Sequence, residues 1–138
     1  MLLVTCDKPD PFEIPGVYLD FSINIMSDVE YFNLQAAGNS KNITAQAVGQ
    51  VSLGYNNNGV IVYNGGDRFY AFDRTCTYEF PVNVRVEATG SSAKCPGCES
   101  VYVLPSMALP SQGSLSKHPL KEYRTQYNSS TGWLRVYN

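Results

Sequence analysis

The stretch Gly59-Val60-Ile61-Val62-Tyr63-Asn64-Gly65-Gly66-Asp67-Arg68-Phe69-Tyr70-Ala71-Phe72 contains two apolar runs on either side of a turn sequence. Residues 64–67 favour a tight turn, because asparagine and glycine tolerate positive φ angles. The flanking runs are rich in β-branched and aromatic residues, which are typical of strands. We therefore predict a β-hairpin over residues 60–72.

Further strands are predicted on both sides of this hairpin. Residues 17–25 alternate strictly between apolar and polar, the period of a strand with one buried side, and the apolar positions are Val17, Leu19, Phe21, Ile23 and Ile25. Alternation returns at residues 82–87, an apolar run follows at 101–104, and a second hairpin is predicted over 123–137. No segment has sustained helical periodicity. The sequence thus predicts an all-β fold, an antiparallel sandwich or barrel.

The chain of 138 residues has the length of one domain. We expect residues 16–138 to form this domain and residues 1–15 to be an N-terminal segment. Residues 105–119 are rich in proline, serine and glycine and are predicted to form a long loop. Long loops in compact domains usually have a function or cover a site.

The charge pattern and the known catalytic motifs exclude several functions. The formal net charge is -2 and no basic stripe occurs, so we expect no nucleic-acid partner. No apolar run reaches the length of a membrane-spanning helix. There is no P-loop, no G-x-G-x-x-G and no nucleophile elbow, so the sequence predicts no catalytic residue.

The N-terminal stretch Leu3-Val4-Thr5-Cys6 resembles the end of a bacterial lipoprotein signal, in which the cysteine carries the lipid. The apolar run before Cys6 is short for such a signal, which argues against this interpretation. Two hypotheses follow. In the first, Cys6 is a lipid anchor, residues 7–15 are a tether, and the protein lies in the cell envelope on the periplasmic or surface side. In the alternative, Cys6 is incidental and the protein is cytoplasmic.

Three of the four cysteines are grouped. Cys76 lies in Asp-Arg-Thr-Cys-Thr-Tyr-Glu, and Cys95 and Cys98 lie in Lys-Cys-Pro-Gly-Cys-Glu-Ser. A Cys-x-x-Cys on a tight turn brings two thiolates within reach of one metal ion. Cys76 follows one predicted strand and the pair precedes another, so we predict that the three sulfurs converge beneath the 105–119 loop. Sulfurs sharing a metal would lie about 3.5–4 Å apart, given ~2.3 Å metal–sulfur bonds.

The spacing of these residues resembles that of the Rieske family. The family has C-x-H, a spacer and C-x-x-H, and this chain has Cys76-x-Tyr78, sixteen residues, and Cys95-x-x-Cys98. The turn Cys-Pro-Gly-Cys-Glu-Ser is similar to the family's C-P-x-H-G-S. The hairpin at 59–72, the proline-containing loop at 113–120 and the hairpin at 127–136 also resemble the family's layout, so the resemblance covers roughly residues 45–138.

In a Rieske 2Fe–2S centre two cysteines hold one iron and two histidines hold the other. The resemblance therefore implies that Cys76 and Cys95 match the cysteines, whereas Tyr78 and Cys98 stand in the histidine positions. Three alternatives remain open. The site holds no metal and Tyr78 fills the space as a core residue; it holds a 2Fe–2S cluster or zinc on the cysteines, with Tyr78, water or His118 as a further ligand; or two cysteines form a disulfide.

The resemblance and the substitutions lead to three functional hypotheses. The absent histidines favour an envelope-associated, non-catalytic scaffold or binding module that has lost the 2Fe–2S cluster. The preserved spacing favours the alternative, an electron-transfer protein that binds an atypical 2Fe–2S cluster or a Cys-ligated metal and docks with a redox partner protein. A third hypothesis is an accessory subunit of an oxygenase, since the chain has no catalytic iron motif of its own.

Overall fold

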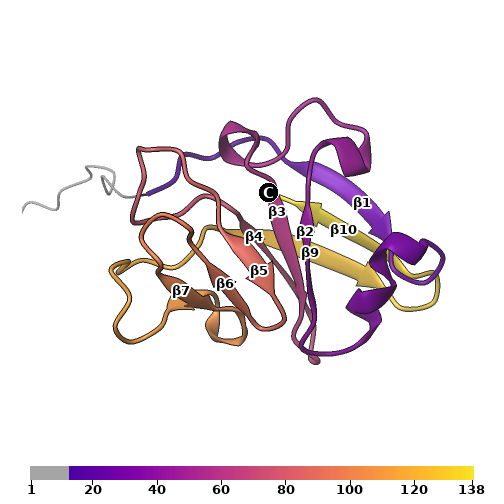
Figure 1. Ribbon diagram of the computed structural model, residues 1–138. Helices are drawn as coiled ribbons and strands as arrows, with labels where there is room; N and C mark the ends of the chain where they lie inside the picture. The colour runs from indigo at the N-terminus through magenta and orange to yellow at the C-terminus, as the bar shows by residue number, and fades with distance from the viewer. Residues whose placement is uncertain (1–12) are drawn as a thin grey trace, which may run out of the picture.

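The computed structural model describes residues 13–138, and this part of the chain forms two antiparallel sheets, with short 3₁₀ helices between strands of the same sheet (Figure 1). The larger sheet has the strand order β1-β10-β9-β4-β3-β2, and the smaller has the order β5-β6-β7-β8. The elements are β1 (Asp20–Asn24), η1 (Val29–Gln35), β2 (Ser40–Ile43), η2 (Gln46–Val48), η3 (Tyr55–Asn57), β3 (Val60–Asn64), β4 (Phe69–Asp73), β5 (Glu87–Thr89), β6 (Ser92–Lys94), β7 (Val101–Val103), η4 (Leu104–Ser106), β8 (Leu109–Pro110), β9 (Glu122–Asn128) and β10 (Trp133–Tyr137).

The predicted all-β, antiparallel fold is confirmed. Both predicted hairpins form: β3 pairs with β4, and β9 pairs with β10. The N-terminal strand also forms, although shorter than predicted, as β1, which pairs with β10. No α-helix occurs between residues 13 and 138, in agreement with the absence of helical periodicity in the sequence.

The burial of both faces of strand β3 explains why its sequence is apolar at consecutive positions. Val60 and Val62 face the core inside the larger sheet, whereas Ile61 and Tyr63 face a second core between the two sheets. A strand that is buried on both faces gains from apolar residues at every position, so alternation disappears. By contrast, β1 buries mainly one face, and its sequence alternates.

The smaller sheet packs against β3 and β4 through this second core. Phe72 of the larger sheet contacts a layer that includes Ala93 and Tyr102 of the smaller sheet. Asn42 of β2 fastens the edges of the two sheets, because its side chain exchanges two 3.0 Å hydrogen bonds with the backbone of Ala88 in β5. The smaller sheet therefore has a fixed position relative to β4, from which the first cysteine loop emerges.

The strand predicted over residues 82–87 is not present. Residues 82–87 do not form a strand with three valines on one face: Val82 is 63% exposed, and only an isolated bridge joins Thr75 to Arg85. The backbone of this segment instead bonds to the first cysteine loop, from Cys76 N–H to Val84 C=O and from Val86 N–H to Arg74 C=O.

The 105–119 segment is less irregular than predicted. It contains the end of η4 and the strand β8, which pairs with β7. Only the part beyond residue 110 is an irregular loop, and it is held by hydrogen bonds that serine side chains accept from backbone N–H groups.

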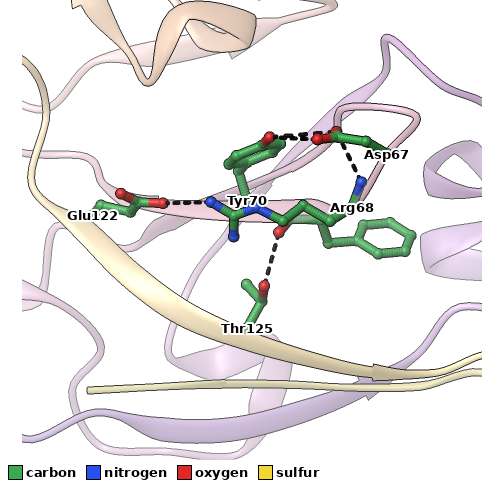
Figure 2. A network of polar contacts seen from close by, with 6 residues as sticks. Asp67, Arg68, Tyr70, Glu122 and Thr125 are labelled. Atoms are coloured by element: carbon green, nitrogen blue, oxygen red, sulfur yellow. Dashed lines mark hydrogen bonds and ion pairs between the residues drawn. The ribbon is translucent and has the colours of Figure 1, made fainter.

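A hollow lies beside the β3–β4 turn and is lined in part by Arg68, Phe69 and Thr125. Figure 2 shows how its wall is held: Arg68 pairs with Glu122 at 3.4 Å, and Thr125 Oγ1 donates to the Phe69 carbonyl. The Tyr70 hydroxyl donates to the Asp67 carboxylate. These polar groups bond to one another, so the network connects the β3–β4 hairpin to β9.

Residues near the N-terminus are described only from Glu13 onward. Ile14, which falls within the expected tether, is buried at 3% exposure. The predicted lipid anchor at Cys6 lies outside the described residues. Among the described residues, no helix has the length and apolar character needed to cross a membrane.

Candidate metal centre

The three cysteines lie on two loops that leave the sheets at the same place. Cys76 comes three residues after the end of β4, and its backbone N–H donates to the Val84 carbonyl at 2.8 Å. Cys95 and Cys98 lie on the turn between β6 and β7. Since the smaller sheet packs on β4, the two loops meet, and the predicted convergence of the sulfurs is confirmed.

Hydrogen bonds and a positive φ angle fix the conformation of the turn between β6 and β7, and with it the positions of the two cysteines. Backbone hydrogen bonds of 2.9 Å run from Cys95 N–H to Ser100 C=O and from Glu99 N–H to Cys95 C=O. Glu99 adopts a φ of 64°, which closes the turn. Gly97 donates its N–H to Cys95 Sγ at 3.4 Å, and a Cβ at this position would come within 2.7 Å of the Glu79 carboxylate. A side chain at position 97 would therefore displace the Glu79 carboxylate.

The sulfurs of Cys76, Cys95 and Cys98 all lie within 4.8 Å of one another. Cys76 Sγ is 3.7 Å from Cys98 Sγ, and all three cysteines are free thiols. We call this group the three-cysteine site. Among the described residues it is the one group of three or more histidine, cysteine, aspartate or glutamate side chains close enough to share a metal ion.

Burial divides the three thiols into two kinds. Cys76 and Cys95 are fully buried, whereas Cys98 is partly exposed. Burial raises the pKa of the Cys95 thiol to about 12, because a thiolate is poorly solvated there. Burial would also raise the pKa of Cys98, but hydrogen bonds from Ser100 and the neighbouring thiols outweigh it and hold the pKa below the ordinary value. Cys98 therefore ionises more readily than Cys95.

A set of buried hydroxyl groups surrounds the sulfurs. Tyr102 Oη lies 3.4 Å from Cys76 Sγ and 3.0 Å from Thr77 Oγ1, and Ser100 Oγ lies 3.1 Å from Cys98 Sγ. Burial raises the pKa of Tyr102, so its phenol stays protonated at neutral pH. Hydrogen bonds to sulfur stabilise the thiolate form, and groups of this kind orient and tune metal ligands.

The irregular part of the 105–119 segment covers this site as predicted. Ser116 N–H donates to Ser100 Oγ at 2.9 Å, and Thr77 Oγ1 donates to the His118 carbonyl at 2.8 Å. The loop is therefore bonded to the residue after Cys76 and to the turn that carries Cys98. These hydroxyl contacts were not predicted from the sequence, because serine and threonine are common in loops for many other reasons.

Tyr78 and His118 are the two residues weighed as further ligands. The idea that Tyr78 fills the site as a core residue is wrong, because 46% of Tyr78 is exposed. The His118 side chain is not part of the group of ligand atoms that lie within 4.8 Å of one another. Instead, the His118 backbone carbonyl takes part in holding the loop.

A buried carboxylate supports the first cysteine loop and was missed in the sequence. Asp73 has no exposed surface. Its Oδ1 accepts hydrogen bonds from the Thr75 N–H and hydroxyl at 2.9 and 2.6 Å. Its other oxygen accepts from Tyr55 N–H at 2.7 Å and Tyr123 Oη at 2.6 Å. Four donors compensate for the burial of the charge. Asp73 thereby fixes Thr75, which directly precedes Cys76.

Comparisons with known proteins give a likeness in fold. No protein-family model and no curated protein sequence matches the chain. A ferredoxin of Sphingomonas yanoikuyae B1 is 15% identical with a TM-score of 0.49, over 77% of this chain and 93% of that one. A chain from the complex of reduced oxygenase and oxidized ferredoxin in carbazole 1,9a-dioxygenase is 18% identical with a TM-score of 0.48, over 73% of this chain and 82% of the other. At such values the likeness carries no argument about function.

Proposed function

We propose that the protein is a Rieske-like, non-catalytic binding module that holds one soft metal ion, such as Zn²⁺, through the thiolates of Cys76, Cys95 and Cys98. The observation that carries this proposal is the 3.7 Å distance between Cys76 Sγ and Cys98 Sγ. Two sulfurs bonded to one tetrahedral ion at ~2.3 Å lie about 3.8 Å apart.

The sulfur geometry supports one ion better than a two-iron cluster. In the Rieske pattern Cys76 would bind one iron and Cys98 the other, so their sulfurs would be separated by more than the spacing of two ligands on one metal. The observed distance matches ligands of the same metal. In the Rieske pattern a second iron would also be bound from position 78, where the Tyr78 side chain is 46% exposed. The donor set therefore fits a single thiolate-bound ion.

Such an ion would join two loops that are distant in the sequence. When bound, it supplies charge neutralisation for three close thiolates and a crosslink between the loop after β4 and the β6–β7 turn. The chain's own contribution is to place the sulfurs, to exclude water from Cys76 and Cys95, and to hold Cys76 and Cys98 by hydrogen bonds with the surrounding hydroxyl groups. The fourth position is left to water or to a group from outside the site.

Metal analysis of anaerobically purified protein, together with an absorption spectrum, tests this proposal. We expect a colourless protein with about one zinc per chain. Replacement of the metal by Co²⁺ should give intense thiolate-to-metal absorption, which Cys98→Ser should weaken and Cys6→Ser, the matched control, should not change. A metal-free protein that binds neither Zn²⁺ nor Co²⁺ would contradict the proposal.

The alternative is an electron-transfer protein with an atypical 2Fe–2S cluster and a redox partner. The sequence spacing and the flanks of the cysteines favour it. The same experiment separates the two functions, because a cluster would give a coloured protein with about two irons and acid-labile sulfide. In that case Cys98→Ser should alter the visible spectrum and the reduction potential.

Attachment to the cell envelope through Cys6 remains part of the proposal, on the basis of the sequence alone. Mass spectrometry of the protein isolated from its own cells tests it. A peptide that begins at a lipidated Cys6 is the expected result. An intact, unmodified peptide across Cys6 would show instead that the cysteine is incidental.

A further inference from the structure

We propose that the three-cysteine site is redox-gated: a low-molecular-weight disulfide oxidises Cys98 and Cys76 to an internal disulfide, and this removes the metal site. The inference rests on the proposed function for its consequence, since gating requires that the reduced site bind metal. The exchange reaction itself depends only on the thiols.

Access to the site selects the thiol that reacts first. Cys76 and Cys95 have no exposed surface, whereas Cys98 is partly exposed on the β6–β7 turn. Thiol–disulfide exchange requires an in-line approach of the attacking sulfur to the disulfide, so a buried thiol cannot reach an external partner. Cys98 is therefore the attacking residue, and Ser100 Oγ at 3.1 Å holds its sulfur in place.

The second thiol is chosen by proximity. Cys76 Sγ lies 3.7 Å from Cys98 Sγ, so the two sulfurs are already in van der Waals contact. Closing this gap to the ~2.05 Å of a disulfide requires movement of less than about 2 Å, which side-chain rotation on a surface turn can supply. Both Cys95 Sγ and Cys76 Sγ have a hydrogen-bond partner, the Gly97 N–H and Tyr102 Oη respectively. The 3.7 Å contact with Cys98 therefore selects Cys76 as the resolving residue.

The chemistry balances with a small disulfide such as oxidised glutathione as the oxidant. The Cys98 thiolate attacks one sulfur of the disulfide, forming a mixed disulfide and releasing one glutathione thiolate. The Cys76 thiolate then attacks Cys98 Sγ, forming the internal disulfide and releasing the second glutathione. The two cysteines lose two electrons and two protons in total, and the oxidant is reduced to two thiols.

Oxidation would leave one of the three thiolates. A disulfide sulfur carries no negative charge and is a poor ligand for Zn²⁺, so Cys95 would remain as the single thiolate. Because Cys95 is fully buried, it could not hold the ion with water ligands alone. The same residues would thus bind metal under reducing conditions and release it under oxidising ones.

The experiment uses the full-length chain in a Cys6→Ser background, reduced and freed of metal with a chelator. The protein is treated with oxidised glutathione and mapped by mass spectrometry of peptides without reduction. Zn²⁺ affinity is measured before and after treatment by competition with a chromophoric chelator. We expect a disulfide between Cys76 and Cys98, a loss of Zn²⁺ affinity of at least about 100-fold, and full recovery with dithiothreitol.

Three variants keep the proposal falsifiable. Cys95→Ser should still form the internal disulfide, Cys76→Ser should stop at a glutathione adduct on Cys98, and Cys98→Ser should not react in the folded state. A disulfide between Cys95 and Cys98, no internal disulfide, or unchanged Zn²⁺ affinity after oxidation would overturn the inference. If the reduced protein binds no metal but still forms the disulfide, the proposed function and the gating are both refuted. The thiol–disulfide exchange between Cys98 and Cys76 would then still stand.

Discussion

The Tyr102 hydroxyl lies 3.4 Å from Cys76 Sγ, and both residues are completely buried. The same hydroxyl is 3.0 Å from Thr77 Oγ1 and accepts a 3.3 Å hydrogen bond from Thr77 N–H. One side chain of the smaller sheet therefore fixes both the first cysteine and the residue that follows it.

Tyr102→Phe should weaken metal binding without abolishing it. Loss of a group that bonds to a metal ligand typically lowers affinity by about 10-fold or more, and the unpaired Thr77 N–H should lower the free energy of unfolding by roughly 1–3 kcal/mol. Zn²⁺ competition and urea unfolding measure the two effects. Tyr70→Phe is the matched control, because Tyr70 bonds to Asp67 on the β3–β4 hairpin (Figure 2). Equal Zn²⁺ affinities for the two variants would contradict the assigned role of Tyr102.

Alkylation should distinguish Cys98 from the two buried thiols. The pKa of Cys98 is lowered by hydrogen bonds and its side chain is partly exposed, so it has both a larger thiolate fraction at neutral pH and better access. In reduced, metal-free protein, iodoacetamide should modify Cys98 before Cys76 and Cys95. The rate should stay high at a pH where free cysteine already reacts slowly. Peptide mapping over a time course measures the order, and earlier modification of Cys95 would be inconsistent with the site as described.

Tyr123 should make the folded protein sensitive to alkaline pH. Burial and the adjacent Asp73 raise the pKa of Tyr123 above its value of about 10 in the unfolded chain. The resulting stabilisation is complete below about pH 10 and is lost as the pH rises towards the folded-state pKa. Tyr123→Phe removes a hydrogen bond to a carboxylate and should cost roughly 1.5–3 kcal/mol at pH 8.

Urea unfolding at pH 8 and pH 11 tests this coupling. The difference in unfolding free energy between wild type and Tyr123→Phe should shrink at pH 11, because only the wild type must keep this phenol protonated in order to fold. A difference that stays constant across this range would show that Tyr123 does not titrate with folding.

Tyr78→His should add a ligand to the three-cysteine site. The sequence resemblance to the Rieske family implies a histidine position at residue 78, and three cysteines with one histidine form a common structural zinc set. We expect Zn²⁺ affinity to rise by about tenfold or more, which corresponds to roughly 1.4 kcal/mol. Tyr127→His, on the exposed end of β9, is the control and should have no effect. Unchanged affinity in Tyr78→His would mean that the backbone at position 78 does not direct its side chain towards the sulfurs.

Both hairpins, and the position of the three cysteines beside the ends of strands, could be predicted from the sequence alone. Residues 64–67 and 128–132 carry their turn chemistry locally, and the apolar runs beside them are short and β-branched. Cys95 and Cys98 lie on a four-residue turn, so their proximity follows from the sequence alone. The convergence with Cys76 followed from the rule that neighbouring strand ends share an edge.

The tertiary structure decided which residues support the three-cysteine site. Residues 82–87 alternate like a strand, but their backbone groups bond to the Cys76 loop, so Val82 is exposed. Tyr102 bonds to Cys76 and Thr77, 26 and 25 residues away, and Asp73 bonds to Tyr55 and Tyr123, 18 and 50 residues away. Periodicity and turn motifs report only on neighbouring residues, whereas the burial of Asp73, the exposure of Tyr78 and the 3.7 Å sulfur contact are set by the packing of one sheet on the other.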